Sequence, residues 1–432
     1  MSDSWKSTSI AQCLAESFAG EWGADPVPGN AVVYRATDID DEGRIVGGGA
    51  ARRLPMGKLA SKALQTGDIL LEGSGGGPGK PVGRVAYFDS KTHGGPATCS
   101  NFFRTLRPAR DHVDPRFLLQ KLFWFYRQPP ILALQQQTTG IINLKFEGYL
   151  ASRIEVPELI SEQAKIAEIL DTLDTAIHET EAFIAKLKAV KQGLLHDLLT
   201  RGIDANGELR PPQCDAPHLY KPSPLGWIPK SWEVRLLDEV AVRGSGHTPS
   251  KSVTSYWNGD IKWVSLADSN RLDDIYIHDT DKAISDLGIA NSSAVLHPAG
   301  TVILSRDAGV GKSAVLASDM AVSQHFIAWR CGDQLEDLFL YFYLQHEKPK
   351  FEAIAVGSTI KTIGLPFFRS YKIALPSRQE QGQMVERLMS VESKLAVLLI
   401  EFAKLKKVKS GLMDDLLTGR VRVTPLLDAA TP

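Results

Sequence analysis

The longest amphipathic stretch of the chain covers residues 161–200. Reading it in alternate steps of three and four residues gives ten seam positions. Eight of these are apolar, and Glu, Lys, Asp and Thr fill the other faces. This pattern is typical of a helix that packs along another helix. At 1.5 Å per residue the helix would be about 60 Å long, so it needs an equally long partner to bury its seam.

The partner lies in the same chain, because residues 377–418 repeat the seam after a shift of 218 positions. Lys191 and Lys409 interrupt the two seams at the same place. Two unrelated helices would not share this oddity, so the sequence predicts an internal duplication. The apolar residues expected to pack between the helices are Ile166, Leu170, Leu173, Ile177, Ile184, Leu187, Leu194, Leu198, Met384, Leu388, Val391, Leu395, Leu398, Phe402, Leu405, Leu412 and Leu416.

Both helices are expected to begin in the same way. A proline is followed closely by a Glu-Gln pair, which is Glu162-Gln163 in the first copy and Glu380-Gln381 in the second. In the second copy Ser377 and Glu380 have the spacing of a capping box, in which each side chain binds a free backbone N–H of the first helical turn.

Two mixed domains precede the two helices. Short apolar runs such as 31–35 and 68–71 alternate with Gly-rich turns in the first domain. A short helix is expected over Pro115–Arg127, with its apolar side chains in the core: Phe117, Leu118, Leu122, Phe123 and Phe125. Six prolines between residues 211 and 229 exclude a continuous helix there and indicate a linker.

The expected organisation is an α+β chain with two duplicated mixed α/β domains separated by a two-helix coiled coil. Its parts are a first mixed domain (1–155), a first helix (156–201), a linker (202–232), a second mixed domain (233–375), a second helix (376–420) and a tail (421–432).

Length and composition are consistent with this organisation. The 432 residues are enough for about two to four domains, and 43% hydrophobic with 23% charged residues is ordinary for a globular protein. No apolar run is long enough to span a membrane, and the N-terminus lacks a signal-sequence pattern, so a cytoplasmic protein is expected. Four isolated cysteines indicate neither a zinc site nor a disulfide framework.

Charge is unevenly distributed along the chain. The net charge is only −1, but residues 44–127 contain fourteen Lys and Arg against five acidic residues. A local basic face is therefore expected in the first domain, without the bulk charge of a protein that wraps nucleic acid.

The two mixed domains also correspond loosely to each other. The segment 67–71 resembles 300–304, and Ser100-Asn101-Phe102-Phe103 takes the place of Ser323-Gln324-His325-Phe326. Framework residues match better than the loops between them. One scaffold that carries two different sets of loops is the pattern expected of a protein whose two domains recognise different targets.

No catalytic constellation is found in the sequence. The segment Asp307–Ser313 ends in Gly-Lys-Ser, but Arg306 stands where a phosphate loop needs its first glycine, and residues 314–316 indicate a strand where that motif needs a helix. Asp114-Pro115-Arg116-Phe117 departs from the Asp-Pro-Pro-Tyr/Phe motif of amino-methyltransferases. We therefore expect a non-catalytic chain without a metal or cofactor of its own.

The candidate functional residues that remain are polar and basic residues in loops of the two matched domains. Lys, Arg, Ser and Thr bind phosphates, whereas Arg, Asn and Gln also pair with base edges in the major groove. For any one such residue an ordinary solvated loop position is the simpler explanation, but the set as a whole favours DNA reading. The candidate DNA contacts are Lys80, Arg84, Ser100, Asn101, Thr138, Lys145, Thr248, Ser250, Lys251, Arg306, Lys312, Ser323, Gln324, Thr359 and Lys361.

Several segments together are similar to one known family, the specificity (S) subunits of type I restriction-modification systems. They are Glu162–Asp171, Leu194–Gly202, Tyr220–Pro229 with Trp232, Gly246–Ser250, and Tyr256–Trp263. The resemblance covers essentially the whole chain. The chain departs from the family pattern at one point, because its first copy has one extra residue between Pro157 and Glu162.

The resemblance implies two target-recognition domains joined by two helices that form an antiparallel coiled coil. Each domain would read one half of a bipartite site in double-stranded DNA, and the helices would set the unread gap. Two modification (methyltransferase) subunits would dock on the helices and bring S-adenosylmethionine, and restriction subunits would bring ATP-driven translocation and cleavage.

Three alternatives remain at this stage. The chain is also compatible with a specificity subunit of a methyltransferase that lacks a nuclease, and with a coiled-coil adaptor that binds only proteins. An adaptor would expose apolar patches on its outer domains, whereas a DNA reader would expose basic and amide side chains. An NTPase that uses Lys312 would require ATP binding by the purified protein.

Overall fold

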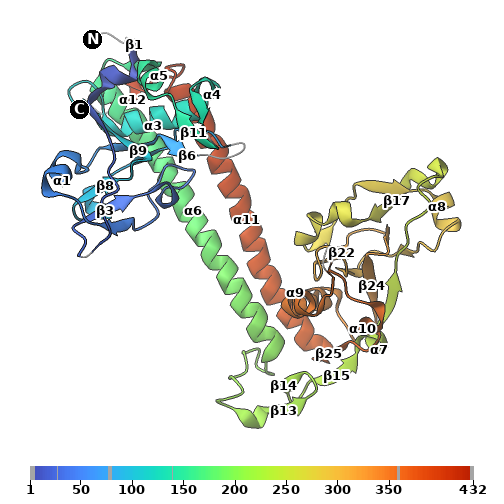
Figure 1. The fold of residues 1–432 in the computed structure, drawn as a ribbon. Coiled ribbons are helices and arrows are strands. Elements are labelled where there is room, and N and C mark those ends of the chain that lie inside the picture. The colour runs from blue at the N-terminus through green and yellow to red at the C-terminus, as the bar shows by residue number, and fades with distance from the viewer. Residues whose placement is uncertain (1–4, 27, 76–79, 139, 358–360, 429–432) are drawn as a thin grey trace. The chain divides into compact units, whose positions relative to one another are not determined.

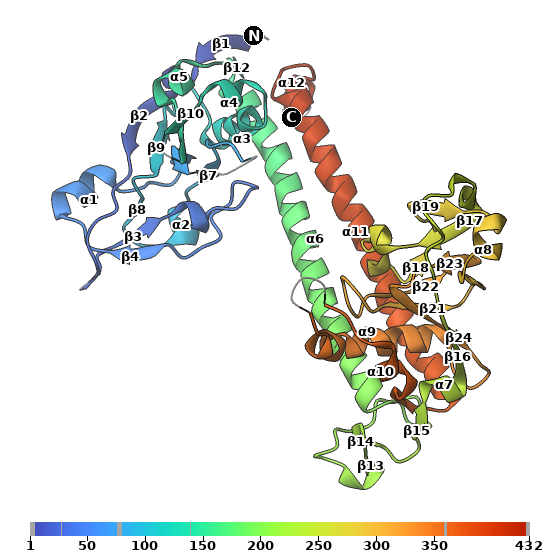
Figure 2. The same ribbon diagram turned by 45° about the vertical axis from the view of Figure 1, so that its right-hand side comes forward.

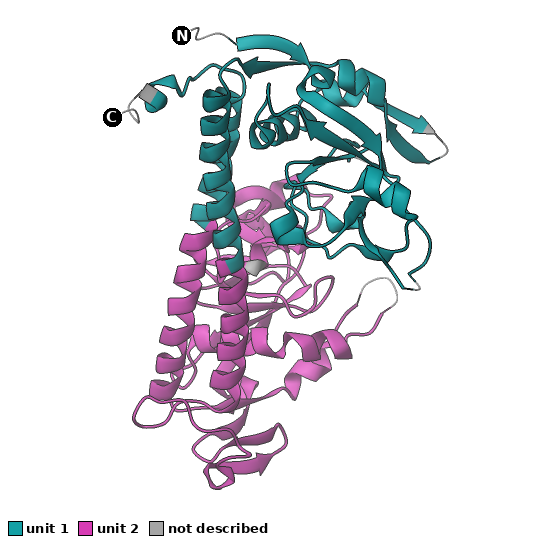
Figure 3. Cartoon of the chain, turned by 90° about the vertical axis from the view of Figure 1, so that its left-hand side faces the viewer, with its two compact units in different colours: residues 1–182, 400–432 teal, residues 183–399 magenta. Residues whose placement is uncertain are grey.

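The computed structural model describes residues 5–26, 28–75, 80–138, 140–357 and 361–428, without the side chains of Thr138, Asp273 and Asp428. The chain forms two compact units (Figure 3). The first combines residues 1–182 with 400–432, and the second is the segment 183–399. Each unit therefore holds one mixed domain together with parts of both long helices, so the mixed domains are not compact units by themselves.

The two long helices lie where the heptad pattern predicts them (Figures 1 and 2). Helix α6 covers Ile160–Thr200 and helix α11 covers Arg378–Leu416. None of the seventeen predicted seam residues is exposed; each is buried or half-buried.

Within the first unit the helices run antiparallel. Glu162, near the start of α6, pairs with Arg422 beyond the end of α11, and Asp174 farther along α6 pairs with Lys409. As α6 advances, its partner residues therefore move back along α11.

Within the second unit the direction is the same. Lys191 pairs with Glu392, and farther along the chain the backbone N–H of Ile203 donates to Glu380. The two seam lysines, Lys191 and Lys409, thus each find a carboxylate on the facing helix.

The other elements of the first unit form small sheets covered by short helices. The strands are β1 (Trp5–Ser9), β2 (Leu14–Ala19), β3 (Ala31–Tyr34), β4 (Ala50–Arg52), β5 (Ile69–Glu72), β6 (Ser74–Gly75), β7 (Val85–Tyr87), β8 (Ala97–Cys99), β9 (Phe103–Pro108), β10 (Gln135–Thr138), β11 (Ile141–Leu144) and β12 (Arg153–Pro157). The helices are α1 (Met56–Lys62), α2 (Ser90–His93), α3 (Pro115–Tyr126), α4 (Pro130–Ala133), α5 (Phe146–Ala151) and α12 (Thr424–Asp428), with 3-10 turns at Ile10–Cys13 and Ala36–Asp38.

The sequence explains helix α3 well. Asp114 caps its start by accepting from the backbone N–H groups of Arg116 and Phe117, and Pro115 occupies the first helical position, where no N–H is needed. The predicted apolar residues of this helix are all buried in the core of the first unit, which also contains Ile166 and Leu416 from the long helices.

The second unit has the same kinds of elements. Its strands are β13 (Tyr220–Ser223), β14 (Gly226–Pro229), β15 (Glu233–Leu236), β16 (Ala241–Ser245), β17 (Trp257–Val264), β18 (Tyr276–Ile277), β19 (Lys282–Ile284), β20 (Leu296–His297), β21 (Val302–Ser305), β22 (Ser313–Leu316), β23 (Met320–Val322), β24 (Phe326–Cys331) and β25 (Lys372–Leu375). Its helices are α7 (Leu237–Val240), α8 (Asp286–Ala290), α9 (Asp337–Ile354) and α10 (Leu365–Arg369), with 3-10 turns at Pro217–Leu219, Thr254–Tyr256, Leu266–Asp268 and Arg271–Asp273.

Sheet topology confirms the loose correspondence of the two mixed domains. The strand order β2-β9-β5-β7 of the first unit recurs as β16-β24-β21-β22 in the second. The order β4-β3-β8, with β3 and β8 parallel, recurs as β19-β17-β23, with β17 and β23 parallel. The pair β1-β12 recurs as β15-β25. The segment 314–316 lies in strand β22, which excludes the phosphate-loop reading.

The predicted capping box of α11 is only half formed. Ser377 accepts from the backbone N–H of Glu380 at 3.3 Å, as expected. The Glu380 carboxylate, however, accepts from the N–H of Ile203 and from the guanidinium of Arg210. The ion pair with the nearly buried Arg210 is stronger than a hydrogen bond to the first turn of the helix. The Glu380 carboxylate therefore joins α11 to the segment after α6.

A buried lysine holds α3 to the end of α11 in the first unit. Lys121 donates from Nζ to the carbonyl oxygen of Leu417 at 2.5 Å, and Trp124 donates to Asp414 at 2.7 Å. Burial lowers the pKa of Lys121 to about 8. In the unfolded chain a lysine titrates near 10.4, so between these two pH values the unfolded state holds more protons than the folded state.

We therefore expect wild-type protein to gain stability relative to Lys121→Met as the pH rises from 8 to 10. The expected change in the difference of unfolding free energies is about 2 kcal/mol. Denaturant unfolding at both pH values measures it, with the exposed Lys91→Met as control. A difference between wild type and Lys121→Met that does not change with pH would contradict the assignment.

None of the helices in the described part of the chain is both long and apolar enough to cross a membrane.

Candidate nucleic-acid interface

The Glu-Gln pair at the start of each long helix fastens a mixed domain to it. In the first unit Gln163 accepts from the backbone N–H of Asp114, the cap of α3, and donates to the carbonyl oxygen of Pro157. In the second unit Gln381 accepts from the N–H of Glu336, the cap of α9, and donates to Pro376. The duplicated glutamine therefore fixes the same domain helix in both units.

The glutamate of each pair receives an arginine from the segment that follows the other long helix. Glu380 accepts from Arg210 at 2.5 Å, and Glu162 accepts from Nε of Arg422 at 2.7 Å. Trp232 also donates to Glu380, at 3.0 Å.

A glycine with positive φ completes each of these joints. Gly202 (φ +68°) lies against Trp232, and Gly419 (φ +73°) lies against Trp5. A Cβ at Gly202 would fall 2.6 Å from the Trp232 ring. Both tryptophans stand at the first strand of a mixed domain, so each domain is held at a defined place on the helix pair.

The loop 246–256 of the second unit is built to lie close to the sheet. A Cβ on Gly246 would fall 1.7 Å from a carbonyl oxygen of strand β23, so only glycine fits there. Trp257 donates from its indole N–H to the carbonyl oxygen of Ser250, and Trp263 donates to that of His247. Two tryptophans thus hold the loop while Ser250 and its neighbour Lys251 stay exposed.

Three predicted DNA contacts of the second unit are brought together beside this loop. Thr248 donates from its hydroxyl to the amide oxygen of Gln324. Arg306 donates from Nε to the Gln324 carbonyl oxygen at 3.1 Å and from Nη1 to that of Ile363 at 3.0 Å. The exposed Lys361 accepts, through its carbonyl oxygen, from the N–H of Ala308 on the adjoining turn.

The predicted contacts of the first unit are more scattered. Lys80 is exposed and pairs with Asp41, Lys145 is exposed at the start of α5, and Asn101 is exposed in the turn between β8 and β9. Thr138 ends strand β10, but its side chain lies outside the described structure, as does the whole of Thr359.

Four predicted contacts have a framework role. Ser100 is 2% exposed and Ser323 is 0% exposed, so neither hydroxyl reaches the surface, and the expectation of a direct DNA contact fails for both. Arg84 pairs with Glu72 and also donates to two carbonyl oxygens of the segment 36–39. Lys312 donates to the carbonyl oxygen of Ser269.

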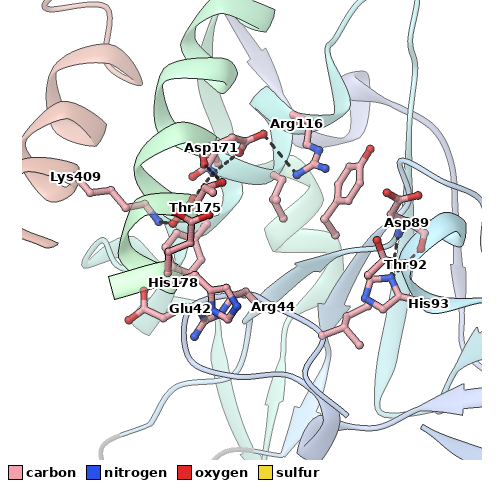
Figure 4. Close-up of a pocket in the computed structure, with 18 residues that line it drawn as sticks. Glu42, Arg44, Asp89, Thr92, His93, Arg116, Asp171, Thr175, His178 and Lys409 are labelled. Atoms are coloured by element: carbon pink, nitrogen blue, oxygen red, sulfur yellow. Dashed lines mark hydrogen bonds and ion pairs between the residues drawn. The ribbon is translucent and has the colours of Figure 1, made fainter. Parts of the chain in front are cut away.

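The first unit also contains a pocket of about 380 Å³ between α3, α6 and the loop 42–45 (Figure 4). Asp171 accepts from Gln120 at 2.9 Å and lies 3.5 Å from Arg116. Burial raises the pKa of the Asp171 carboxyl, and the hydrogen bond from Gln120 opposes this rise. Arg44 pairs with Asp40 and Glu181.

Several charges around this pocket are paired, because Asp174 accepts from Gln120 and pairs with Lys409, and Glu42 pairs with Arg127. The pocket thus serves as a junction between the mixed domain and the helices. Within the described residues no cluster of His, Cys, Asp and Glu has the arrangement of a metal site.

Sequence reasoning did not identify the joints made by Arg210, Arg422, Trp5 and the two glycines. Their only signal was the repeated Leu-Leu-Thr ending of both helices followed closely by glycine, at Gly202 and Gly419. The two arginines follow at different distances after these glycines, so the repeat does not align them.

Two equivalent mixed domains, each fastened to the start of one copy of a duplicated helix, define a class of internally duplicated two-domain proteins. Residues 26–189 and 229–409 both match the model of the type I restriction modification DNA specificity domain. The chain therefore belongs to the family of type I restriction-modification specificity subunits.

Known relatives agree with this assignment. The MjaX type I restriction enzyme specificity subunit of Methanocaldococcus jannaschii is 25% identical over 84% of this chain and 81% of its own length. The MjaVIII specificity subunit of the same organism is 25% identical over 72% of each chain. The crystal structure of a type I S subunit from M. genitalium has the same fold, with a TM-score of 0.56 at 15% identity over 96% of each chain.

Proposed function

We propose that this chain directs a type I restriction-modification complex to a bipartite, asymmetric site in double-stranded DNA. Each mixed domain binds one half of the site, and the helix pair sets the unread gap. The observation that carries this proposal is one backbone scaffold, present twice, with different side chains on its loops. A protein that recognised two identical half-sites would need no such difference.

The geometry of the helices supports a spacing role. The ion pairs Asp174–Lys409 and Lys191–Glu392 are separated by seventeen residues along α6 and by seventeen along α11. One antiparallel register therefore serves both pairs. At 1.5 Å per residue and 3.4 Å per base pair, helices of this length match more than one turn of duplex.

Exposed apolar residues on the helices support docking of two modification subunits. Val190 of α6 and Val408 of α11 occupy equivalent positions of the duplication, and both are exposed. Val397 and Ile400 are exposed as well. The duplication of Val190 as Val408 suits two copies of one partner.

In this division of labour the chain supplies recognition only. The modification subunits bring S-adenosylmethionine, and restriction subunits bring ATP-driven translocation and cleavage. Mapping of methylated bases by single-molecule sequencing tests the proposal in the native host and in a strain that lacks this gene. One bipartite motif should be methylated in the host alone, and a motif that persists without the gene would refute the proposal.

The free chain is expected to bind DNA weakly and with a steep dependence on salt, because its net charge is −1 and partner subunits provide much of the phosphate contact. Titration of a labelled duplex carrying the mapped site, at about 50 and 200 mM salt, measures this. The complex with modification subunits serves as the control. Nanomolar specific binding by the free chain at physiological salt would count against the division of labour.

A further inference from the structure

Three backbone segments meet at the same place in both units, at the end of the central strand β5 or β21. In the first unit the N–H of Gly73 donates to the carbonyl oxygen of Phe102 at 2.7 Å, and Leu144 donates to that of Gly73 at 2.9 Å. In the second unit Arg306 donates to His325 at 2.9 Å, and Ile363 donates to Arg306 at 3.0 Å.

A cross-strand pairing follows directly in each unit. Ser74 pairs with Asn143 in the first, and Asp307 pairs with Thr362 in the second. We call this arrangement the loop junction. It consists of Gly73, Ser74, Asn101, Phe102 and Asn143 in the first unit, and of Arg306, Asp307, Gln324, His325 and Thr362 in the second. The backbone is the same in both, but all five side chains differ.

In the second unit the loop junction presents hydrogen-bonding groups. The nearly buried Asp307 carboxylate accepts from Nδ1 of His325 at 2.8 Å and from the hydroxyl of Thr362. When Asp307 accepts the Nδ1 hydrogen, Nε2 of an uncharged imidazole is left as a hydrogen-bond acceptor. Gln324 is exposed beside it, and Thr248 holds its amide oxygen.

The backbone next to Asp307 is also strained. Ala308 has φ +42°, a conformation that a residue with a Cβ rarely adopts. Its N–H donates to Lys361 at 3.3 Å. Such strain persists only where the surroundings hold it, and it concentrates at functional positions.

In the first unit the loop junction presents a ring and amides. Phe102 occupies the place of His325 and is 45% exposed. Asn101 is exposed beside it, in the place of Gln324. Ser74 donates from its hydroxyl to the amide oxygen of Asn143 at 2.6 Å. Packing gives no reason for a phenylalanine at the tip of an exposed turn.

We propose that the loop junction is the base-contacting position that makes the two half-sites differ, with Gln324 and His325 reading bases in one half and Asn101 and Phe102 in the other. Gln and Asn suit adenine, whose N6 donates and whose N7 accepts. An acceptor at His325 Nε2 suits the amino group of cytosine or adenine, and the Phe102 ring suits a thymine methyl group. Asp307 is a positioning residue that acts through His325.

The inference rests on the proposed function, and its test uses the complete modification complex expressed in cells. The variants His325→Phe, Gln324→Ala and Asp307→Asn alter the second unit, and Phe102→His alters the first. Methylated sites are mapped by single-molecule sequencing, and thermal melting checks that each variant is folded. His218→Phe, an exposed histidine of the linker, is the matched control.

The three variants of the second unit should lower discrimination at one or two positions of a single half-site by about tenfold. Asp307→Asn should act at the same base as His325→Phe, whereas a merely structural role would affect all positions equally. Phe102→His should alter only the opposite half-site, and His218→Phe should alter neither.

Folded variants that keep both half-sites unchanged would overturn the inference and leave the proposed function standing. A wild-type complex that methylates no bipartite site would overturn both.

Discussion

Replacing Glu380 by alanine is expected to lower the free energy of unfolding of the second unit by about 3–5 kcal/mol. The glutamate is 7% exposed and accepts from three groups: Arg210, the indole N–H of Trp232 and the backbone N–H of Ile203. Its removal leaves a nearly buried guanidinium without a counter-charge, and two buried donors without an acceptor. Such losses cost far more than a surface ion pair.

Two related variants make this expectation specific. Glu386→Ala removes an exposed glutamate from the same helix and should change stability by less than about 0.5 kcal/mol. Glu162→Ala removes the equivalent carboxylate of the first unit. Its effect should be smaller than that of Glu380→Ala, because Arg422 is more exposed than Arg210 and regains water more easily.

Denaturant unfolding followed by tryptophan fluorescence reports these differences, since Trp232 lies at the joint. Losses of similar size for Glu380→Ala and Glu386→Ala would show that the buried ion pair does not hold the second unit on its helices.

Lengthening both long helices by one heptad is expected to change the recognised DNA site without changing either half-site. The insertion duplicates residues 176–182 in α6 and 400–406 in α11, which end or begin at the division between the two units. Seven residues add about 10 Å of helix, which corresponds to about 3 base pairs of duplex. A heptad keeps the apolar seam facing its partner.

The methylated sites of this variant should therefore carry the original half-sites with a gap about 3 base pairs longer. The level of methylation should fall, because three extra base pairs also turn the second half-site by about 100° around the duplex. An insertion in α6 alone puts the two seams out of register, and it should abolish methylation. Original spacing with altered half-sites would exclude the helices as the measuring element.

The outcome for individual residues shows where sequence reasoning succeeds. The heptad stretches 161–200 and 377–418 match the observed helices to within two residues, and the wider bounds 156–201 and 376–420 match them to within four. A heptad repeat is written in consecutive positions, and here it is present twice. Helix α3 was located equally well, since Asp114 and Pro115 mark its start and its phenylalanines mark its buried face.

Individual residues of the candidate site were harder to predict from the sequence. Ser100 and Ser323 have the composition of a DNA contact, but they are buried in the framework. Their neighbours Phe102 and His325 gained significance only when the two loop junctions were compared. The sequence does not reveal which of two adjacent side chains in a turn faces outward, because that depends on the strands on either side.

The sequence by itself determined the duplication, the two long helices with their buried seam and the presence of two mixed domains. These follow from periodicity and internal repetition, which need no knowledge of distant contacts. Only the tertiary structure decided that Arg210 and Arg422 close on the opposite glutamates, and that Asp307 orients His325. Those pairings join residues far apart in the chain, and burial makes them strong, so they appear only once the chain has folded.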